Sequence, residues 1–444
     1  MGSGRLLSPI PGRARARAVR AASALVLLAV TQLPGITSAG DSSASGAVVH
    51  PASTAGGAPG PVVAIGGALR YDHAAVWSRL VALAGGPGAR YVVVATASSD
   101  PAAVGARVVA ALATHGASAE ALPVAPELAG TDAQRAARDP EMVERVRRAR
   151  GVFFTGGAQE RIVDTLQPGG EATPLLDAIR ELHARGGVIA GTSAGAAAMS
   201  GVMFRDATDV IAVMKGSLRP GREVDAGLGF TGEGLLVDQH FLRRGRLGRL
   251  LPLMLERGMR FGLGVEEDSA AIVHASSIEI VGAGGALFVD LVQASSDPAS
   301  GAFNISNARL SFLGDGDRLD LRTRVVTPAP VRDGEGRIDA AAPGFKPHHE
   351  QAPYLLDVLG EGAVLRAMTI AVDGPGEVRG LAYDARPDAA PPNDLGFEFR
   401  FRRDALTAGW YSSASGTDAY TLAGVRLDVA PVRLARPLYA PWSR

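Results

Sequence analysis

The stretch VIAGTSAGAAAMS (residues 188–200) joins a short apolar segment, through glycine and serine, to a run of small helix-forming residues. Three other segments have the same character: VVAIGG (62–67), YVVVAT (91–96) and GVFFTGG (151–157). Each is a continuous apolar run that is followed by a helix-like stretch. Such runs, alternating with helices, predict parallel strands that are covered on both faces. We therefore expect an α/β fold in which a mostly parallel sheet is sandwiched by helices.

Glycines stand at the carboxyl ends of these predicted strands. They occupy positions 66–67, 156–157 and, around Ser193, positions 191 and 195. Ligands of open parallel sheets bind at the carboxyl ends of the strands. We therefore expect these glycine-rich turns to lie near one another and to border a site.

The composition excludes several kinds of chemistry. The chain has 444 residues, enough for two or three domains, and its 45 basic residues balance its 45 acidic ones. No global charge therefore attracts nucleic acid or an anionic membrane. The absence of cysteine excludes disulfides, thiolate metal sites and cysteine nucleophiles. A nucleophile in this chain must be an oxygen.

The N-terminus has the features of a secretory signal. Several arginines precede an apolar run at 24–30, and small residues follow at 37–39. The run is too short to span a bilayer comfortably, and no cysteine follows to carry a lipid. We therefore predict a signal peptide at 1–39 and a secreted or periplasmic protein without a stable membrane anchor. An uncleaved basic tail is the alternative.

The rest of the chain divides by composition. Residues 40–60 are rich in Gly, Ala, Ser and Pro and predict a linker, and 61–290 carry the α/β pattern. Residues 291–444 alternate with period two, as in GFEFRFRRD (396–404), which predicts a β-rich region whose role the sequence does not reveal. Residues 348 and 349 are both histidines, but no third ligand lies at a spacing that would suit a metal site.

Ser193 is a candidate nucleophile. The spacing of Gly191, Ser193 and Gly195 matches a nucleophile elbow, in which a serine projects from a sharp strand-to-helix turn. The spacing alone is a weak signal in a chain with 56 glycines. The preceding strand and following helix strengthen it, because a helix N-terminus favours a developing oxyanion. The alternative is a serine that caps the helix.

A serine nucleophile needs a base, and His240 is the main candidate. It follows a predicted strand and lies among arginines, so we expect it on the same strand-end edge as Ser193. The arginines form either a solvated helix face or a wall that binds carboxylates. His73, after the first strand, is a rival base. An acid could come from the strand end at 266–268, which gives the chain order Ser, His, acid, unlike α/β-hydrolases.

Taken together, VVAIGG, FFTGGAQ, GTSAGA, the DQHFLRRGRLGRLL segment and GLGVEED resemble the cyanophycinases. These belong to a group of serine peptidases that also contains aspartyl dipeptidases. The resemblance covers roughly residues 61–275 and implies a fold similar to glutamine amidotransferases and flavodoxin. It also implies that Ser193 is the nucleophile, that His240 is the general base, and that Glu267 orients the imidazole.

The resemblance extends to the groups around this triad. It implies that the backbone N–H groups of Gly157 and Ala194 form an oxyanion hole. The implied substrate is cyanophycin, a poly-aspartate that bears arginine on each side-chain carboxyl, and the product is the β-Asp-Arg dipeptide. No metal or organic cofactor is implied. The positions that match substrate-pocket residues are Gln159, Asp238, Gln239, Arg244, Arg246 and Arg249.

The chain departs from this pattern in three ways. Ala158 stands where relatives commonly have a polar or acidic residue, and VEE stands where an Asp-Glu pair is expected. The cytoplasmic enzymes also lack the signal peptide and the long C-terminal region. Two other functions therefore stay open: a peptidase for short aspartyl peptides, and a secreted, non-catalytic polymer-binding protein. The sequence does not decide between a monomer and a homodimer.

Overall fold

The structure is a computed structural model that describes residues 58–332, 336–386, 392–414, 416, 418–438 and 442. The predicted signal peptide at 1–39 and residues 40–57 of the predicted linker lie outside the described residues. Those that are described belong to one compact unit. Within them, no helix has the length and apolar character that crossing a membrane requires.

The first sheet has nine strands, and its parallel half confirms the α/β prediction. In sheet order this half comprises β1 (Val62–Ile65), β5 (Val188–Thr192), β4 (Gly151–Phe154), β2 (Arg90–Val94) and β3 (Ser118–Leu122). On the other side of β1 the sheet continues with antiparallel strands. These are β10 (Ser269–His274), β11 (Ser277–Gly282), β14 (Arg318–Asp320) and β15 (Val325–Thr327).

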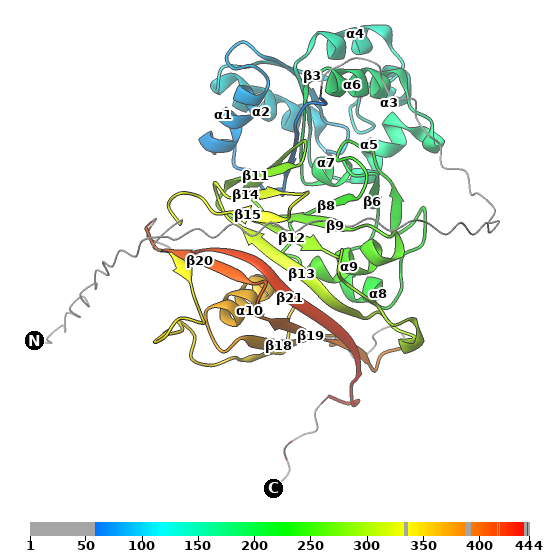
Figure 1. Cartoon of the computed structure of the whole chain (residues 1–444). Helices are drawn as coiled ribbons and strands as arrows, with labels where there is room; N and C mark the ends of the chain where they lie inside the picture. Colours follow the sequence, from blue (N-terminus) through cyan, green and yellow to red (C-terminus); the bar gives the residue numbers. More distant parts are fainter. Residues whose placement is uncertain are drawn as a thin grey trace, which may run out of the picture. The chain divides into compact units, whose positions relative to one another are not determined.

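Helices cover both faces of the parallel half (Figure 1). In β1, Val63 and Ile65 pack with α1 and α2, whereas Val62 and Ala64 face the cluster that contains α4, α5 and α6. This alternation follows from the period of two in a strand. Aspartate or threonine caps followed by proline begin several of these helices. The helices are α1 (Ala74–Leu83), α2 (Pro101–Thr114), α3 (Ala133–Ala136), α4 (Pro140–Arg148), α5 (Gln159–Leu166) and α6 (Pro174–Ala184).

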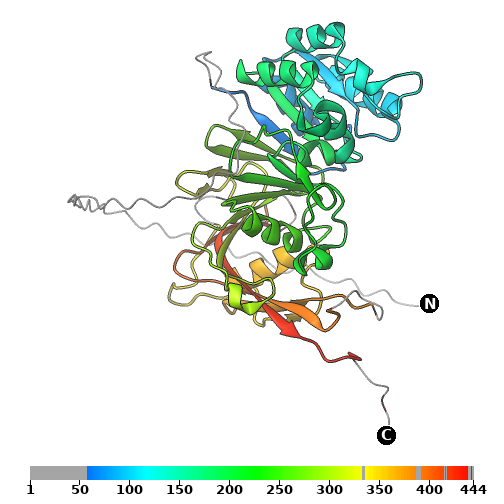
Figure 2. The ribbon, with the colours of Figure 1, turned by 90° about the vertical axis from the view of Figure 1, so that its right-hand side faces the viewer.

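The second sheet has ten strands and combines the predicted catalytic segment with the C-terminal region. The boundary predicted between residues 290 and 291 lies between β12 and β13, which pair antiparallel. Strand β21 lies between β13 and β19 in both ribbon views (Figures 1 and 2). Along the sheet path the strands are β8 (Leu235–Gln239), β9 (Phe261–Val265), β12 (Ala286–Asp290), β13 (Ile305–Leu313), β21 (Ala419–Arg433), β19 (Leu395–Arg402), β18 (Glu377–Ala382) and β17 (Tyr354–Leu355), with β16 (Arg337–Ile338) and β20 (Ala408–Ser412) beside them.

The place of β8 corrects one expectation. We expected the strand before His240 to end on the same sheet edge as Ser193, but β8 pairs with β9 in the second sheet. The chain then passes from β9 to β10 of the first sheet through the turn at residues 266–268. The two sheets therefore meet at this acidic turn.

Short helices and a hairpin complete the described chain. The apolar core of the second sheet includes residues of α8, α9 and α10, among them Val213, Leu250 and Met368. The remaining elements are α7 (Ala194–Ala197), β6 (Val202–Phe204), β7 (Val224–Ala226), α8 (Val210–Met214), α9 (Leu247–Glu256), α10 (Ala363–Val372), η1 (Pro168–Gly170) and η2 (Pro298–Ser300).

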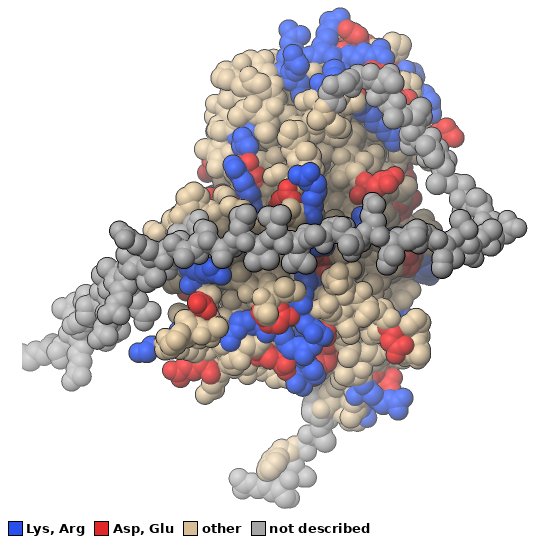
Figure 3. Space-filling model, in the orientation of Figure 1, with Lys and Arg blue, Asp and Glu red and all other residues tan. Residues whose placement is uncertain are grey.

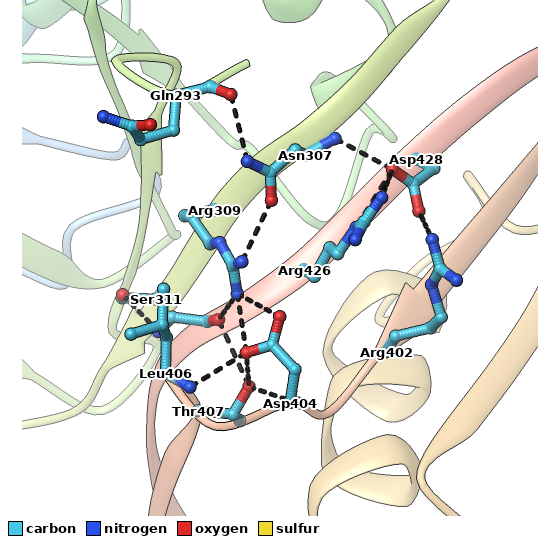
Figure 4. Close-up of polar contacts among 11 residues, drawn as sticks. Gln293, Asn307, Arg309, Ser311, Arg402, Asp404, Leu406, Thr407, Arg426 and Asp428 are labelled. Carbon is cyan, nitrogen blue, oxygen red and sulfur yellow. Dashed lines mark hydrogen bonds and ion pairs between the residues drawn. The ribbon is translucent and has the colours of Figure 1, made fainter. Parts of the chain in front are cut away.

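Charged pairs connect the C-terminal strands. Asn307, at a bulge of β13, has φ +62° and donates its backbone N–H to Asp428 of β21 at 2.8 Å. Asp428 also pairs with Arg402 of β19 (Figure 4), so one carboxylate holds three strands. The space-filling view shows acidic and basic side chains intermixed over the C-terminal strands (Figure 3). These contacts fix the register on both sides of β21.

Asp317 is the centre of a buried polar cluster. Its side chain is fully buried and pairs with Arg332, which is also buried. It further accepts hydrogen bonds from Thr421 Oγ1 at 2.6 Å and from the backbone N–H of Ala329 and of Gly314, each at 2.7 Å. The cluster joins β21 to the loops on either side of β14 and β15.

We expect the Asp317→Ala substitution to destabilise the protein by about 3–5 kcal/mol, because it leaves the Arg332 guanidinium buried without a counter-charge. Denaturant unfolding measures this loss. The matched control is Glu144→Ala, which removes an exposed ion pair with Arg148 and should cost less than about 1 kcal/mol. Equal losses in the two variants would contradict the importance of the cluster.

Candidate active site

Ser193 lies on a strained turn between β5 and α7. Its φ of +53° and ψ of −116° are unusual for a residue with a side chain. A Cβ on Gly191 would meet the Gly195 backbone at 2.6 Å, and one on Gly195 would meet Phe154 O at 2.4 Å. The flanking glycines are therefore required for the close packing of strand and helix, as in a nucleophile elbow. The Ser193 side chain makes no capping hydrogen bond to α7, so the capping alternative does not describe it.

The structure brings Ser193, His240 and Glu267 into one hydrogen-bonded chain. Ser193 Oγ lies 2.9 Å from His240 Nε2, and His240 Nδ1 lies 2.5 Å from Glu267 Oε1. When the imidazole proton is on Nδ1 and is hydrogen-bonded to Glu267, Nε2 has a lone pair that can accept the proton of Ser193. This is the geometry that a serine nucleophile and its base require.

The glycine pair after β1 makes room for the imidazole. Gly66 O accepts a hydrogen bond from the His240 N–H at 2.7 Å. Gly67 has φ +106°, and a Cβ there would lie 2.3 Å from the His240 ring. Gly67 O also accepts the Asp268 N–H at 2.9 Å. The first strand thus contributes backbone groups that hold the base and the acidic turn together.

The residues of the implied oxyanion hole border Ser193. A Cβ on Gly156 would lie 3.1 Å from Ser193 Cβ, so the turn at 156–157 lies against the nucleophile. Gly157 has φ +140°, and a Cβ there would lie 1.9 Å from Ala97 O. Ala194 is the first residue of α7, where a backbone N–H has no partner within the helix. Gly157 is thus one residue beyond the turn that touches Ser193, and Ala194 follows Ser193 directly, but their role as an oxyanion hole stays a prediction.

The three acidic residues of the turn have different partners. Glu266, to which the sequence assigned no separate role, accepts the backbone N–H of Leu242 at 2.6 Å, of Arg243 at 3.0 Å and of Glu267 at 2.9 Å. Burial nevertheless raises the pKa of the Glu266 carboxyl. Glu266 thus anchors the backbone that follows His240. The only sequence signal was its place in the acidic strand end.

His73, the other histidine considered as a base, is hydrogen-bonded to Asp268. His73 Nδ1 lies 2.9 Å from Asp268 Oδ1, and Arg70 Nε donates to Asp268 Oδ2 at 2.8 Å. His73 is therefore engaged with Asp268, whereas His240 is the histidine that contacts Ser193 Oγ.

Asp238, Arg246 and Arg249 form a buried ion cluster instead of an open wall. Asp238 is fully buried and accepts Arg249 Nη2 at 2.6 Å, Arg249 Nε at 2.7 Å and Arg246 Nη1 at 3.2 Å. The Arg249 guanidinium also lies over the Phe204 ring at 4.3 Å. Burial lowers the pKa of Arg246 to about 10, and its Nη1 donates to Gln239 O at 2.8 Å. Because these three side chains bond to one another and to the backbone carbonyls of Gln239 and Ala207, they support the strand end that carries Gln239 and His240.

The other predicted pocket residues differ in exposure: Gln239 is buried, Gln159 is half-buried and Arg244 is exposed. Gln159 Nε2 donates to Phe204 O at 2.9 Å and to Arg205 O at 3.1 Å, which holds its side chain against the backbone. Gln239 Oε1 lies 3.5 Å from Ser193 Oγ. Arg244 is exposed and forms no ion pair with any residue that the structure describes. Arg244 is therefore the predicted pocket residue that is most open to solvent, and Gln239 is the one that contacts Ser193 Oγ.

The surroundings keep His240 neutral at neutral pH. Burial lowers the pKa of its imidazole from the ordinary value of 6.5, the hydrogen bond to Glu267 opposes this, and the positive charge of Arg244 adds to it. A neutral imidazole is the form that accepts a proton. Over the described ranges, no group of three or more His, Asp or Glu side chains could hold a metal ion.

We expect a fluorophosphonate to label Ser193 at a rate that rises with pH and reaches half its maximum below pH 6.5, because deprotonated His240 activates the serine. In Glu267→Gln the midpoint should move lower, since Glu267 raises this pKa, and the maximal rate should fall. Mass spectrometry of the adduct measures both, with Ser193→Ala as the blank. A midpoint above pH 6.5 would contradict the assignment.

Comparisons with known proteins identify the relatives of this chain. Residues 62–281 match the model of peptidase family S51. The chain is 36% identical over 193 residues to a cyanophycinase of Trichormus variabilis, which covers 41% of this chain and 60% of that one. It is 32% identical over 278 residues to a cyanophycinase of Geminocystis herdmanii, covering 59% and 94% of the two chains.

The chain thus spans about three fifths of the first relative and nearly all of the second. A solved peptidase from an acI-B1 Actinobacterium is 20% identical with a TM-score of 0.44, over 59% of this chain and 97% of that one. From the family model and the relative that is matched over 94% of its length, we conclude that the chain belongs to peptidase family S51.

Proposed function

We propose that the chain is a serine peptidase that hydrolyses cyanophycin to β-Asp-Arg dipeptides. The observation that carries this proposal is the chain of hydrogen bonds from Ser193 Oγ through the His240 imidazole to Glu267. Family membership and the names of the two cyanobacterial relatives support the choice of substrate.

The proposed reaction proceeds through an acyl-enzyme. His240 Nε2 accepts the proton of Ser193 as Oγ attacks an aspartyl carbonyl, and then protonates the departing amine. Water next attacks the ester, again with His240 as base, and Ser193 is regenerated. Glu267 stabilises the imidazolium that forms in each half. The backbone N–H groups of Gly157 and Ala194 would stabilise the negative oxygen of the tetrahedral intermediate.

Two side chains around the site, Arg244 and Gln239, suit the carboxylate and peptide groups of this substrate. Each branch of cyanophycin carries a free carboxylate and a guanidinium group. Arg244 can form a planar, bidentate pair with a carboxylate. Gln239, beside Ser193, offers an amide that can hydrogen-bond to the peptide near the scissile bond. The buried cluster around Asp238 would keep this strand end in place while substrate binds.

We expect the Ser193→Ala substitution to reduce dipeptide release by about 10³-fold or more, because no other oxygen takes the place of Oγ. The measurement is clearing of a cyanophycin suspension together with chromatography of β-Asp-Arg. Ser300→Ala, at an exposed serine in η2, is the matched control and should keep full activity. Undiminished release by Ser193→Ala would refute the mechanism.

Parallel assays with simple Asp-X dipeptides separate the alternatives. Hydrolysis of these dipeptides without clearing of the polymer would favour an aspartyl dipeptidase. No hydrolysis of either substrate, together with no phosphonate adduct at Ser193, would favour a non-catalytic binding protein.

We also propose that the protein is exported. The basic, apolar and small-residue order of residues 1–39 supports cleavage near Gly40. In a bacterial host, the full chain should appear in the periplasm or medium with a new N-terminus near Gly40, whereas a chain that starts at Gly40 should stay in the cytoplasm. N-terminal sequencing of each fraction tests this. Recovery of the full chain uncleaved in the cytoplasm would contradict it.

A further inference from the structure

A cavity lies where the C-terminal region meets the loop after His240. Its volume is about 570 Å³, within the range of pockets that bind small ligands. The catalytic segment contributes Arg244 and the residues around the start of α8. The C-terminal region contributes the other wall, which includes Asp357, Leu359, Tyr383 and Arg386.

This cavity is structurally coupled to the triad. Arg244 lies one turn beyond His240, and its N–H donates to His240 O at 3.1 Å. A Cβ on Gly245 would lie 2.2 Å from Leu359 O, so the C-terminal loop packs directly on this turn. Arg243 bridges the two regions, because its Nη1 lies 3.1 Å from Glu361 Oε1 and its Nε 3.5 Å from Glu267 Oε2.

Among the residues that the structure describes, some charged side chains of the cavity form ion pairs and others do not. Arg386 Nη2 lies 2.8 Å from Asp209 Oδ2, and the same guanidinium pairs with Asp384. These three residues are therefore already engaged in ion pairs, with one negative charge in excess. Arg244 and Asp357 remain, one from each wall; both are exposed, and neither forms an ion pair with a residue in the described part of the chain. Arg244 and Asp357 are thus the cation and the anion of the lining that have no ion pair within the described residues.

Tyr383 adds an aromatic surface to the wall of the cavity that carries Asp357. Its side chain is half-buried, and it lines the cavity with Asp357. Guanidinium groups pair with carboxylates and stack on aromatic rings, and both contacts strengthen when water is partly excluded. A planar cation is therefore the chemical group that this wall fits best.

We propose that this cavity binds an arginyl branch of the substrate next to the unit being cleaved. Arg244 would pair with the free carboxylate of that branch, and Asp357 and Tyr383 would hold its guanidinium. This inference rests on the proposed function and assigns the C-terminal region a role in substrate selection. One ligand carrying both charges satisfies both unpaired residues.

Binding tests the proposal without catalysis. The probe is a synthetic two-unit fragment, (β-Asp-Arg)₂, titrated by calorimetry into the mature protein carrying Ser193→Ala. Adding Asp357→Asn should weaken binding about tenfold, because a charged hydrogen bond is lost. Asp177→Asn, an exposed carboxylate on α6 outside the cavity lining, is the matched control and should bind normally. A fragment with citrulline in place of arginine should bind weakly and equally to all three proteins.

Kinetic measurements on the protein with Ser193 intact give a second test. Asp357→Asn should raise KM for cyanophycin about tenfold with little change in kcat, whereas Asp177→Asn should leave both constants unchanged. If the polymer is hydrolysed but Asp357→Asn and Asp177→Asn bind and react alike, the assignment of the cavity is overturned and the proposed function stands. If the polymer is not hydrolysed but the fragment still binds through Asp357, the site stands and the proposed function fails. If the fragment does not bind to Ser193→Ala at all, the cavity assignment fails.

Discussion

The geometry of the site depends on the acidic turn that carries the chain from the second sheet to the first. Glu267 holds the imidazole, Glu266 holds the backbone beyond His240, and Asp268 binds both His73 and the Gly67 carbonyl. The partners lie in two segments, the one that follows β1 and the one that begins at His240. Burying carboxylates is unfavourable unless they receive hydrogen bonds, and these three receive them from the groups that must be aligned. The hydrogen bonds that offset the partial burial of these carboxylates therefore also hold the two sheets in alignment.

Backbone strain is concentrated at the same place. Ser193, His240 and Asp268 all have positive φ, a region that residues with side chains rarely occupy. Such strain persists only where the surroundings over-determine the conformation. Here Ser193 N–H donates to Ile65 O at 2.9 Å, and His240 N–H donates to Gly66 O at 2.7 Å. The end of β1 is thus the common support of nucleophile and base, although it contributes no side chain to the triad.

Sequence patterns predicted the parallel half of the first sheet and the elbow, because both depend on local periodicity and on glycine spacing. Ser193, His240 and Glu267 form the expected hydrogen-bonded chain. Strand pairing is not local, and so β8 could not be placed in the second sheet. For the same reason, the sequence could not predict which of the arginines after His240 are buried and which are exposed. Arg249 is buried on Asp238, whereas Arg244 is free, and no spacing rule distinguishes them.

The C-terminal region is part of the support of the site. His240 follows β8, and the acidic turn follows β9, both at one end of the ten-stranded sheet. Pairing of β12 with β13 continues that sheet into the C-terminal region, and Asp428 and Asp317 hold its later strands. Removing these strands would expose the edge of β12 and the apolar core that it shares with α9 and α10. The position of the base is therefore linked, through one continuous sheet, to residues more than a hundred positions beyond the triad.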